Sequence, residues 1–269
     1  MILTDVHTHS KFSTDGKSTL EEMVSTAKAR GLRYFGVSEH FDLDESSVKC
    51  YGTTDYNAYF LCARRLQEKY NDERFTFLAG GELGFADEQR VRDGAAEIAE
   101  KYHPDFIVNS IHNVNGADCY LLPYFEGKSK HLAYGDYLKA VSESLDAPYS
   151  YDIVGHVGYV SRHAPYEDCK IRYAEFADLY DEILRKIVQK GKILEVNSSS
   201  RGAGSEFLPD VDVLARYFEL GGRRVSFGSD AHFTERIADK REQVVRELKK
   251  IGFDCITVPV RGNYISVAI

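Results

Sequence analysis

The feature that most constrains this chain is a regular alternation of short apolar runs with longer amphipathic segments. Short β-branched runs are typical of buried strands, and the segments between them space their apolar residues as a helix does. Seven such alternations predict a parallel sheet with helical crossovers, and 269 residues suit one α/β barrel in a single domain. The predicted strands are Ile2–Val6, Tyr34–Val37, Phe75–Ala79, Phe106–Val108, Tyr151–Val154, Ile193–Val196 and Arg224–Phe227.

Three of the intervening segments carry clear helical signals. Leu20–Ala27 repeats apolar residues every three to four positions, Ser18-Thr19-Leu20-Glu21 resembles a capping box, and Gly31 is placed to end the helix. The same periodicity predicts helices that include Tyr59–Tyr70 and Phe176–Ile187. Two late strand-like runs have no assigned place in the sheet: Ile256–Val260 and Tyr264–Val267.

Composition limits the environment and the ligands. The chain carries 34 Lys plus Arg against 42 Asp plus Glu, a formal charge of -8, without a basic block. This balance argues against nucleic acid and anionic membranes as partners. No apolar window is long enough to span a membrane, and the first residues do not resemble a signal peptide, so we expect a cytoplasmic protein. The five cysteines are scattered, and we expect them to be reduced.

Histidine and acidic residues recur where the predicted strands end. In a parallel α/β fold these positions converge on one rim. His7 and His9 lie two residues apart and face the same side, and Asp5 shares their parity and is expected to orient His7. The complete set at strand ends is His7, His9, His40, Glu82, His112, His156, Asp230 and His232.

Any one of these residues, taken alone, is more simply read as a structural histidine or a solvated carboxylate. The set as a whole changes that interpretation, because six of the nine histidines occupy equivalent positions in successive strand–helix units. So many titratable groups on one rim would be costly in desolvation or repulsion without bound cations. The sequence therefore predicts a site for several divalent metal ions.

These residues, together with Asp15, resemble the ligand series of the polymerase and histidinol phosphatase (PHP) family in order and spacing. The resemblance implies that residues 1–269 form one domain, a distorted (β/α)7 barrel, holding three ions of zinc, manganese or iron. It assigns His7, His9, Glu82 and Asp230 to one ion, with Glu82 as a bridge. It assigns Asp15, His40 and His232 to a second ion, and His112 and His156 to the third.

Such a centre suits hydrolysis of a small phosphate monoester by a metal-bridging hydroxide, without a covalent intermediate. Two loops on the same rim supply candidate substrate contacts: Arg162 with His163, and Asn197 with Ser198 and Arg201. No strand–elbow motif surrounds Ser198–Ser200, which argues against a serine nucleophile. The residues expected to take part in catalysis are Asp230, His232, Arg162 and Arg201.

The chain is most similar to stand-alone histidinol-phosphatase members of that family, which implies L-histidinol phosphate as substrate in histidine biosynthesis. The ammonium group of that substrate calls for a carboxylate, for which Asp42 and Asp44 are candidates. Aromatic residues available to stack on its imidazole are Tyr120, Tyr124, Tyr134 and Tyr159.

Three alternatives stay open, and the sequence does not predict an oligomeric state. The first is a PHP phosphoesterase acting on nucleotides or other small phosphate esters. The second is an amidohydrolase-type enzyme, although such enzymes expect a lysine where Ser110-Ile111-His112 stands. The third is a catalytically silent domain stabilised by metal, which the full set of ligand residues disfavours.

Overall fold

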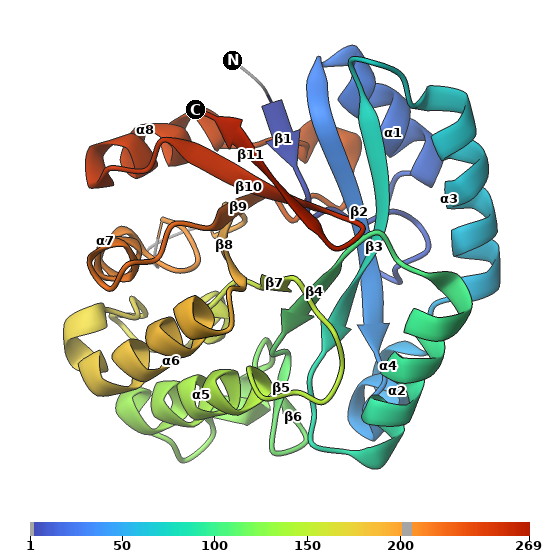
Figure 1. Ribbon diagram of the computed structural model, residues 1–269. Coiled ribbons are helices and arrows are strands. Elements are labelled where there is room, and N and C mark those ends of the chain that lie inside the picture. Colours follow the sequence, from blue (N-terminus) through green and yellow to red (C-terminus); the bar gives the residue numbers. More distant parts are fainter. Residues whose placement is uncertain (1–2, 201–205) are drawn as a thin grey trace.

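A parallel sheet of seven strands forms the frame of the protein (Figure 1). The structure is a computed structural model that describes residues 3–200 and 206–269. The strands follow the order β1-β2-β3-β4-β7-β8-β9, and every neighbouring pair is parallel. Their bounds are β1 Leu3–Asp5, β2 Leu32–Asp42, β3 Thr76–Gly84, β4 Ile107–Ser110, β7 Ile153–Val154, β8 Ile193–Asn197 and β9 Val225–Gly228.

The first and last strands of this sheet approach each other and nearly close a barrel. The amide of Val6 donates to the carbonyl of Phe227 at 3.1 Å, and the amide of Asp230 donates to the carbonyl of His7 at 2.8 Å. A parallel bridge joins Thr8 to Ala231. These contacts bring the segments that follow β1 and β9 together. The predicted seven-stranded α/β barrel is confirmed.

The strands overlap the predicted runs, but several continue further, and β2 and β3 do so by five residues each. β2 stays paired with β3 from Tyr34 opposite Thr76 to Asp42 opposite Gly84. The predicted runs end sooner because inward-facing polar residues interrupt the apolar pattern near the strand ends. Those extensions carry His40 and Glu82, so the strands themselves hold these side chains in place.

Helices cover the outside of the sheet (Figure 1). Within the described part of the chain, none is both long and apolar enough to traverse a lipid bilayer. The helices are α1 Leu20–Ala29, α2 Glu45–Tyr51, α3 Tyr56–Tyr70, α4 Gln89–Tyr102, α5 Lys130–Ser144, α6 Ala177–Gln189, α7 Val211–Glu219 and α8 Arg241–Ile251.

The predicted helices correspond to α1, α3 and α6, with one correction at the first cap. Thr19, not Ser18, caps α1, because its side chain accepts from the amide of Glu22 while the Glu22 carboxylate accepts from the amide of Thr19. Gly31 follows this helix with a φ of 76°, a left-handed conformation that glycine adopts at little cost.

The two late strand-like runs form an antiparallel hairpin, β10 Cys255–Val260 and β11 Asn263–Ala268. Val258 and Val267 of this hairpin join one buried cluster with Phe106 and other apolar residues of the barrel strands. At its tip, Arg261 contacts Asp105 just before β4, with 2.7 Å from Nε to Oδ1. The hairpin therefore packs against the amino-terminal end of the barrel, opposite the strand ends that carry the histidines.

Candidate active site

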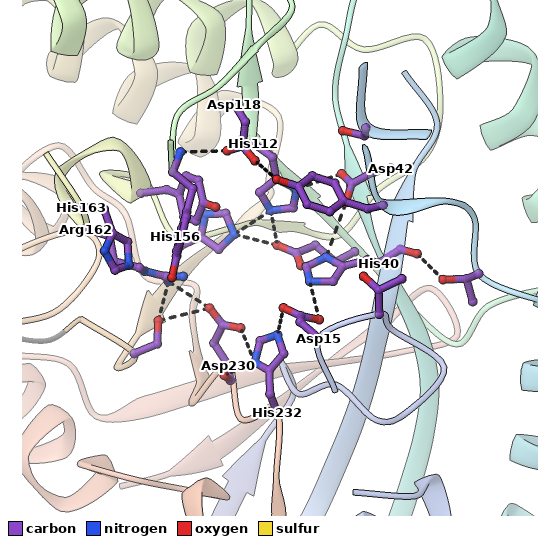
Figure 2. A pocket seen from close by; sticks show the side chains of 18 of the residues that line it. Asp15, His40, Asp42, His112, Asp118, His156, Arg162, His163, Asp230 and His232 are labelled. Atoms are coloured by element: carbon purple, nitrogen blue, oxygen red, sulfur yellow. Dashed lines mark hydrogen bonds and ion pairs between the residues drawn. The ribbon is translucent and has the colours of Figure 1, made fainter. Parts of the chain in front are cut away.

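The carboxyl ends of the strands bring the predicted metal-binding side chains together at one end of the barrel (Figure 2). His7 and His9 follow β1, His40 lies near the end of β2, and Glu82 lies near the end of β3. His112 and His156 follow β4 and β7, and Asp230 and His232 follow β9. This convergence follows from the parallel topology, since all seven strands of the sheet run in the same direction.

The carboxylate of Glu82 lies at the centre of the cluster. Its side chain is 1% exposed, and its two oxygens face five imidazoles. Oε2 lies near ring nitrogens of three histidines and Oε1 near those of two. The contacts are His7 Nε2 at 3.3 Å, His9 Nε2 at 3.5 Å, His40 Nδ1 at 3.0 Å, His112 Nε2 at 3.2 Å and His156 Nε2 at 2.6 Å.

The donor atoms fall into four overlapping groups, each compact enough to surround one cation. His7, His9, His40 and Glu82 each belong to two of these groups. The groups are His9/His40/His232, His7/His9/Asp230, His7/Glu82/His156 and His40/Glu82/His112. Because the groups share members, the geometry favours several closely spaced cations over a single one.

Asp15 approaches the cluster from the loop before α1. One carboxylate oxygen lies 2.8 Å from Nε2 of His232 and the other 3.7 Å from Nε2 of His40. Its side chain is 56% exposed, whereas those of the other members are buried or partly buried. Asp15 therefore lies at the solvent side of the cluster.

The electrostatics of the histidines reflect their crowding. Burial and the neighbouring rings of His40 and His232 lower the pKa of His9 to about 3. His9 is therefore neutral at neutral pH, the form in which an imidazole binds metal. Burial would lower the pKa of His112 also, but Asp42 and Glu82 raise it to about 10.

Two buried ring nitrogens provide the test of whether this cluster fits metal ions. Nε2 of His7 and Nε2 of His9 have no hydrogen-bond partner among the described residues, although both side chains are 0% exposed. Both atoms point towards carboxylate oxygens of Glu82 and Asp230. A buried nitrogen without a partner is costly, and a shared cation would satisfy it. The donor set fits divalent metals that accept imidazole and carboxylate ligands.

The ring nitrogens that face away from the cluster are held by neighbouring side chains. Nδ1 of His7 lies 2.6 Å from Oε1 of Glu195, and Nδ1 of His112 lies 2.8 Å from Oδ1 of Asp42. Glu195, and not Asp5 as expected, holds the His7 ring; the Asp5 carboxylate contacts the backbone amide of His7 and otherwise turns towards the loop after β9. It accepts hydrogen bonds from Ser229 and from the amide of Ala238.

A cavity of about 640 Å³ opens beside the cluster. Arg162 lines it and contacts Asp230, with 2.9 Å between Nη2 and Oδ2, and also donates to Ser199. His163 lines the same cavity with its ring centroid 3.9 Å from that of Tyr120. The two predicted contacts from the first loop therefore face the space in which a substrate would lie.

The second predicted loop is placed differently. Ser198 is fully buried and donates to the carbonyl of Asp239, and Asn197 is fully buried and accepts from Ser199. Neither lines the cavity, where Ser199 lies instead, so as substrate contacts both stay predictions from the sequence. Strand pairing and the following turn decide which side chain faces inward. Arg201 lies outside the described residues.

Three further expectations concern the cavity wall. Asp42 lines the cavity, but its carboxylate is engaged with His112. Asp44 caps α2 by accepting from the amide of Ser47 and is not in the wall. Of the four tyrosines, Tyr120 and Tyr159 line the cavity, whereas Tyr124 and Tyr134 are buried in the core.

Sequence reasoning missed Asp118 and Tyr51, which also line the cavity; Asp118 is labelled in Figure 2. Tyr51 donates to the carboxylate of Asp118 at 2.7 Å. Asp118 belongs to a short hairpin, β5 Asn113–Val114 and β6 Ala117–Asp118, that lies outside the seven-stranded sheet. The sequence Asn115-Gly116-Ala117-Asp118-Cys119 around this residue carries no pattern that marks it as part of a site.

Known proteins share both the sequence and the architecture. The PHP domain model matches residues 5–199. A probable histidinol-phosphatase from Clostridium acetobutylicum is 32% identical over 234 residues, which is 87% of this chain and 88% of that relative. The histidinol-phosphatase of Lactococcus lactis is 28% identical over 250 residues, covering 93% and 91%.

A solved structure extends the comparison to nearly the whole chain. The crystal structure of histidinol phosphate phosphatase from Lactococcus lactis, complexed with zinc, L-histidinol and phosphate, matches with a TM-score of 0.87. It is 26% identical and covers 98% of each chain. The match of more than half of the sequence to one family model, with this agreement in fold, leads to one assignment: the chain belongs to the PHP domain family.

Proposed function

We propose that this protein is a metal-dependent phosphomonoesterase that hydrolyses L-histidinol phosphate to L-histidinol and phosphate. The observation that carries the proposal is one cavity lined by the imidazole and carboxylate cluster, by Arg162, and by Asp118 with the rings of Tyr120 and Tyr159. An ester with an anionic phosphate and a cationic, aromatic leaving group complements these groups. The relatives named as histidinol-phosphatases support the same substrate.

Three divalent ions of zinc, manganese or iron would be held by the clustered side chains. Bound ions of this kind lower the pKa of a water molecule and draw phosphoryl oxygens into the site. The zinc in the Lactococcus lactis structure supports this choice of metals. The proposed ligands are His7, His9, Asp15, His40, Glu82, His112, His156, Asp230 and His232.

Arg162 is the proposed phosphate clamp. Its guanidinium is a planar donor that suits phosphate oxygens, and its contact with Asp230 holds it at the edge of the metal-binding cluster. Ser199 lies against both groups and lines the cavity. We include Arg201 in this clamp as a prediction from the sequence.

Asp118 and its neighbours form the proposed leaving-group side. The Asp118 carboxylate accepts from Tyr51 and from the amide of Tyr120, which fixes its orientation while leaving lone pairs for an ammonium group. The ring of Tyr159 lies next to His112 and His156, and Tyr120 lies beyond it. These aromatic faces suit a small heterocycle such as imidazole. We propose that residues 1–269 act as one unit in this reaction.

The proposal is tested by phosphate release from a panel of esters after elemental analysis of the purified protein. The panel contains L-histidinol phosphate, AMP, glycerol phosphate and a dinucleotide, each measured at matched metal content. We expect kcat/KM for histidinol phosphate to exceed the others at least about tenfold, a difference of about 1.4 kcal/mol. Equal turnover of AMP would instead identify a broader PHP phosphoesterase.

A further inference from the structure

The carboxylate of Glu195 is buried inside the barrel beside the cluster, and no strand-end pattern predicts it. It lies in the middle of β8 with 1% exposure and faces His7, just after β1, across the barrel interior. We propose that Glu195 is a positioning residue that sets the tautomer of His7 and the place of His156. It would thereby govern how tightly the cluster binds metal, without touching metal or substrate itself.

The geometry links Glu195 to both histidines at once. Oε1 lies 2.6 Å from Nδ1 of His7, and Oε2 accepts from the backbone amide of His156 at 2.6 Å. Asn197 adds a weaker contact at 3.4 Å from Nδ2 to Oε2. One carboxylate therefore connects residues that lie far apart in the sequence, on either side of the proposed site.

This contact decides which nitrogen of His7 is available to a cation. A carboxylate only accepts hydrogen bonds, so Nδ1 of His7 must carry the proton. In the neutral imidazole that binds a cation, Nε2 then keeps its lone pair, and this atom faces Glu82 at 3.3 Å without a hydrogen-bond partner in the described chain. Carboxylates that orient metal-binding imidazoles in this way raise ligand basicity.

The neighbouring strand leaves room for this pair. At Gly228 of β9, an added Cβ would lie 2.1 Å from Oε1 of Glu195 and 2.6 Å from Cβ of His7. Any larger residue would displace one of the two side chains. The glycine at this position therefore supports the contact between Glu195 and His7, in addition to their hydrogen bond.

Glutamine cannot replace the carboxylate, although it has nearly the same shape. Both oxygens of Glu195 face donors, the ring N–H of His7 and the amide N–H of His156. A glutamine offers one oxygen and one NH2 group, so one of these donors would lose its acceptor. If the NH2 group faces His7, the ring must move its proton to Nε2, and that nitrogen can no longer bind metal.

The decisive experiment compares Glu195→Gln with Asp105→Asn in metal titrations of the metal-stripped protein. Asp105 is the matched control, since it is equally buried but lies at the opposite end of the barrel. We expect Glu195→Gln to lower the affinity for zinc by about 10–100-fold and to reduce bound metal on elemental analysis. Asp105→Asn should change thermal stability but keep the wild-type metal affinity.

Full metal content and unchanged affinity in folded Glu195→Gln would overturn the proposal. If this variant does not fold, 15N-histidine NMR of the zinc-loaded wild-type protein decides instead, with His7 identified by the signal lost in His7→Asn. We expect a proton on Nδ1 and metal on Nε2, and the reverse would contradict the inference. The inference rests on the proposed metal centre, and a wild-type protein that binds no zinc would refute that centre separately.

Discussion

Nη2 of Arg162 lies 2.9 Å from Oδ2 of Asp230, which joins the proposed phosphate clamp directly to a proposed metal ligand. Burial would favour a protonated Asp230, but Arg162 and neighbouring histidines hold its pKa well below the usual range. Asp230 also adopts a φ of 53°, and its amide donates to the carbonyl of His7. The backbone and Arg162 together therefore keep an ionised carboxylate pointed into the cluster.

Replacing Arg162 should impair the reaction more than metal binding. Arg162→Lys keeps a positive charge near Asp230 but loses the planar fork, and we expect kcat/KM to fall about 10–100-fold. Arg162→Ala should lower kcat/KM by about 100–1000-fold, because removing one hydrogen-bond donor to the transition state has an effect of that size. Arg216→Lys, on the surface of α7, is the control. Steady-state kinetics with elemental analysis checks this, and unchanged KM and kcat in Arg162→Ala would contradict it.

Removing the carboxylate of Glu82 should disable the centre. Glu82→Gln leaves five imidazoles around a neutral group, so bound divalent ions lose a charged ligand. We expect activity to drop at least about 1000-fold and metal content to fall. Glu97→Gln on the exposed face of α4 should behave like the wild type. A fully metal-loaded, active Glu82→Gln protein would exclude the proposed bridging role.

Chelation should abolish activity and lower thermal stability together. The ligand side chains crowd one rim, and ions that bind only the folded state stabilise it by linkage. We expect the Tm of the stripped protein to rise with added zinc or manganese and activity to return. Magnesium serves as the control because imidazole-rich sites disfavour it. Full activity after exhaustive chelation would rule out the metal-dependent mechanism.

Asp118 should discriminate between esters with and without an ammonium group. Asp118→Asn removes the charge that Tyr51 orients, and we expect KM for histidinol phosphate to rise about 10–100-fold. The matched substrate is 3-(imidazol-4-yl)propyl phosphate, which lacks the ammonium group. Its KM should change little in the Asp118→Asn variant. Asp93→Asn, on exposed α4, is the control variant. An equal rise in KM for both esters would show that Asp118 does not recognise the ammonium group.

Asp42 should act on metal binding through His112. Its carboxylate lies 2.8 Å from Nδ1 of His112, so Asp42→Asn should weaken metal affinity about tenfold. The ratio of kcat/KM for the two esters above should stay at the wild-type value. Metal titration and the two-substrate assay measure these effects. A selective loss of the ammonium ester would instead return Asp42 to the substrate-binding role expected from the sequence.

The outcome for the two candidate loops shows how far sequence reasoning extends. Arg162 and His163 line the cavity as expected, because they follow directly from a strand end and a short turn. Ser198 also follows a strand end, yet it turns to Asp239 and leaves Ser199 at the cavity. Alternation of side chains ceases where a strand ends, so position alone does not give orientation there.

The sequence by itself determined the barrel and the members of the cluster. Strand and helix periodicities are local properties, and parallel strands must end on one rim, so His7 and Glu82 could be placed there without a structure. The tertiary structure alone decided the contacts that orient them, such as Glu195 with His7 and Asp42 with His112. These pairs come from distant segments, and only barrel closure sets which side chains meet across its interior.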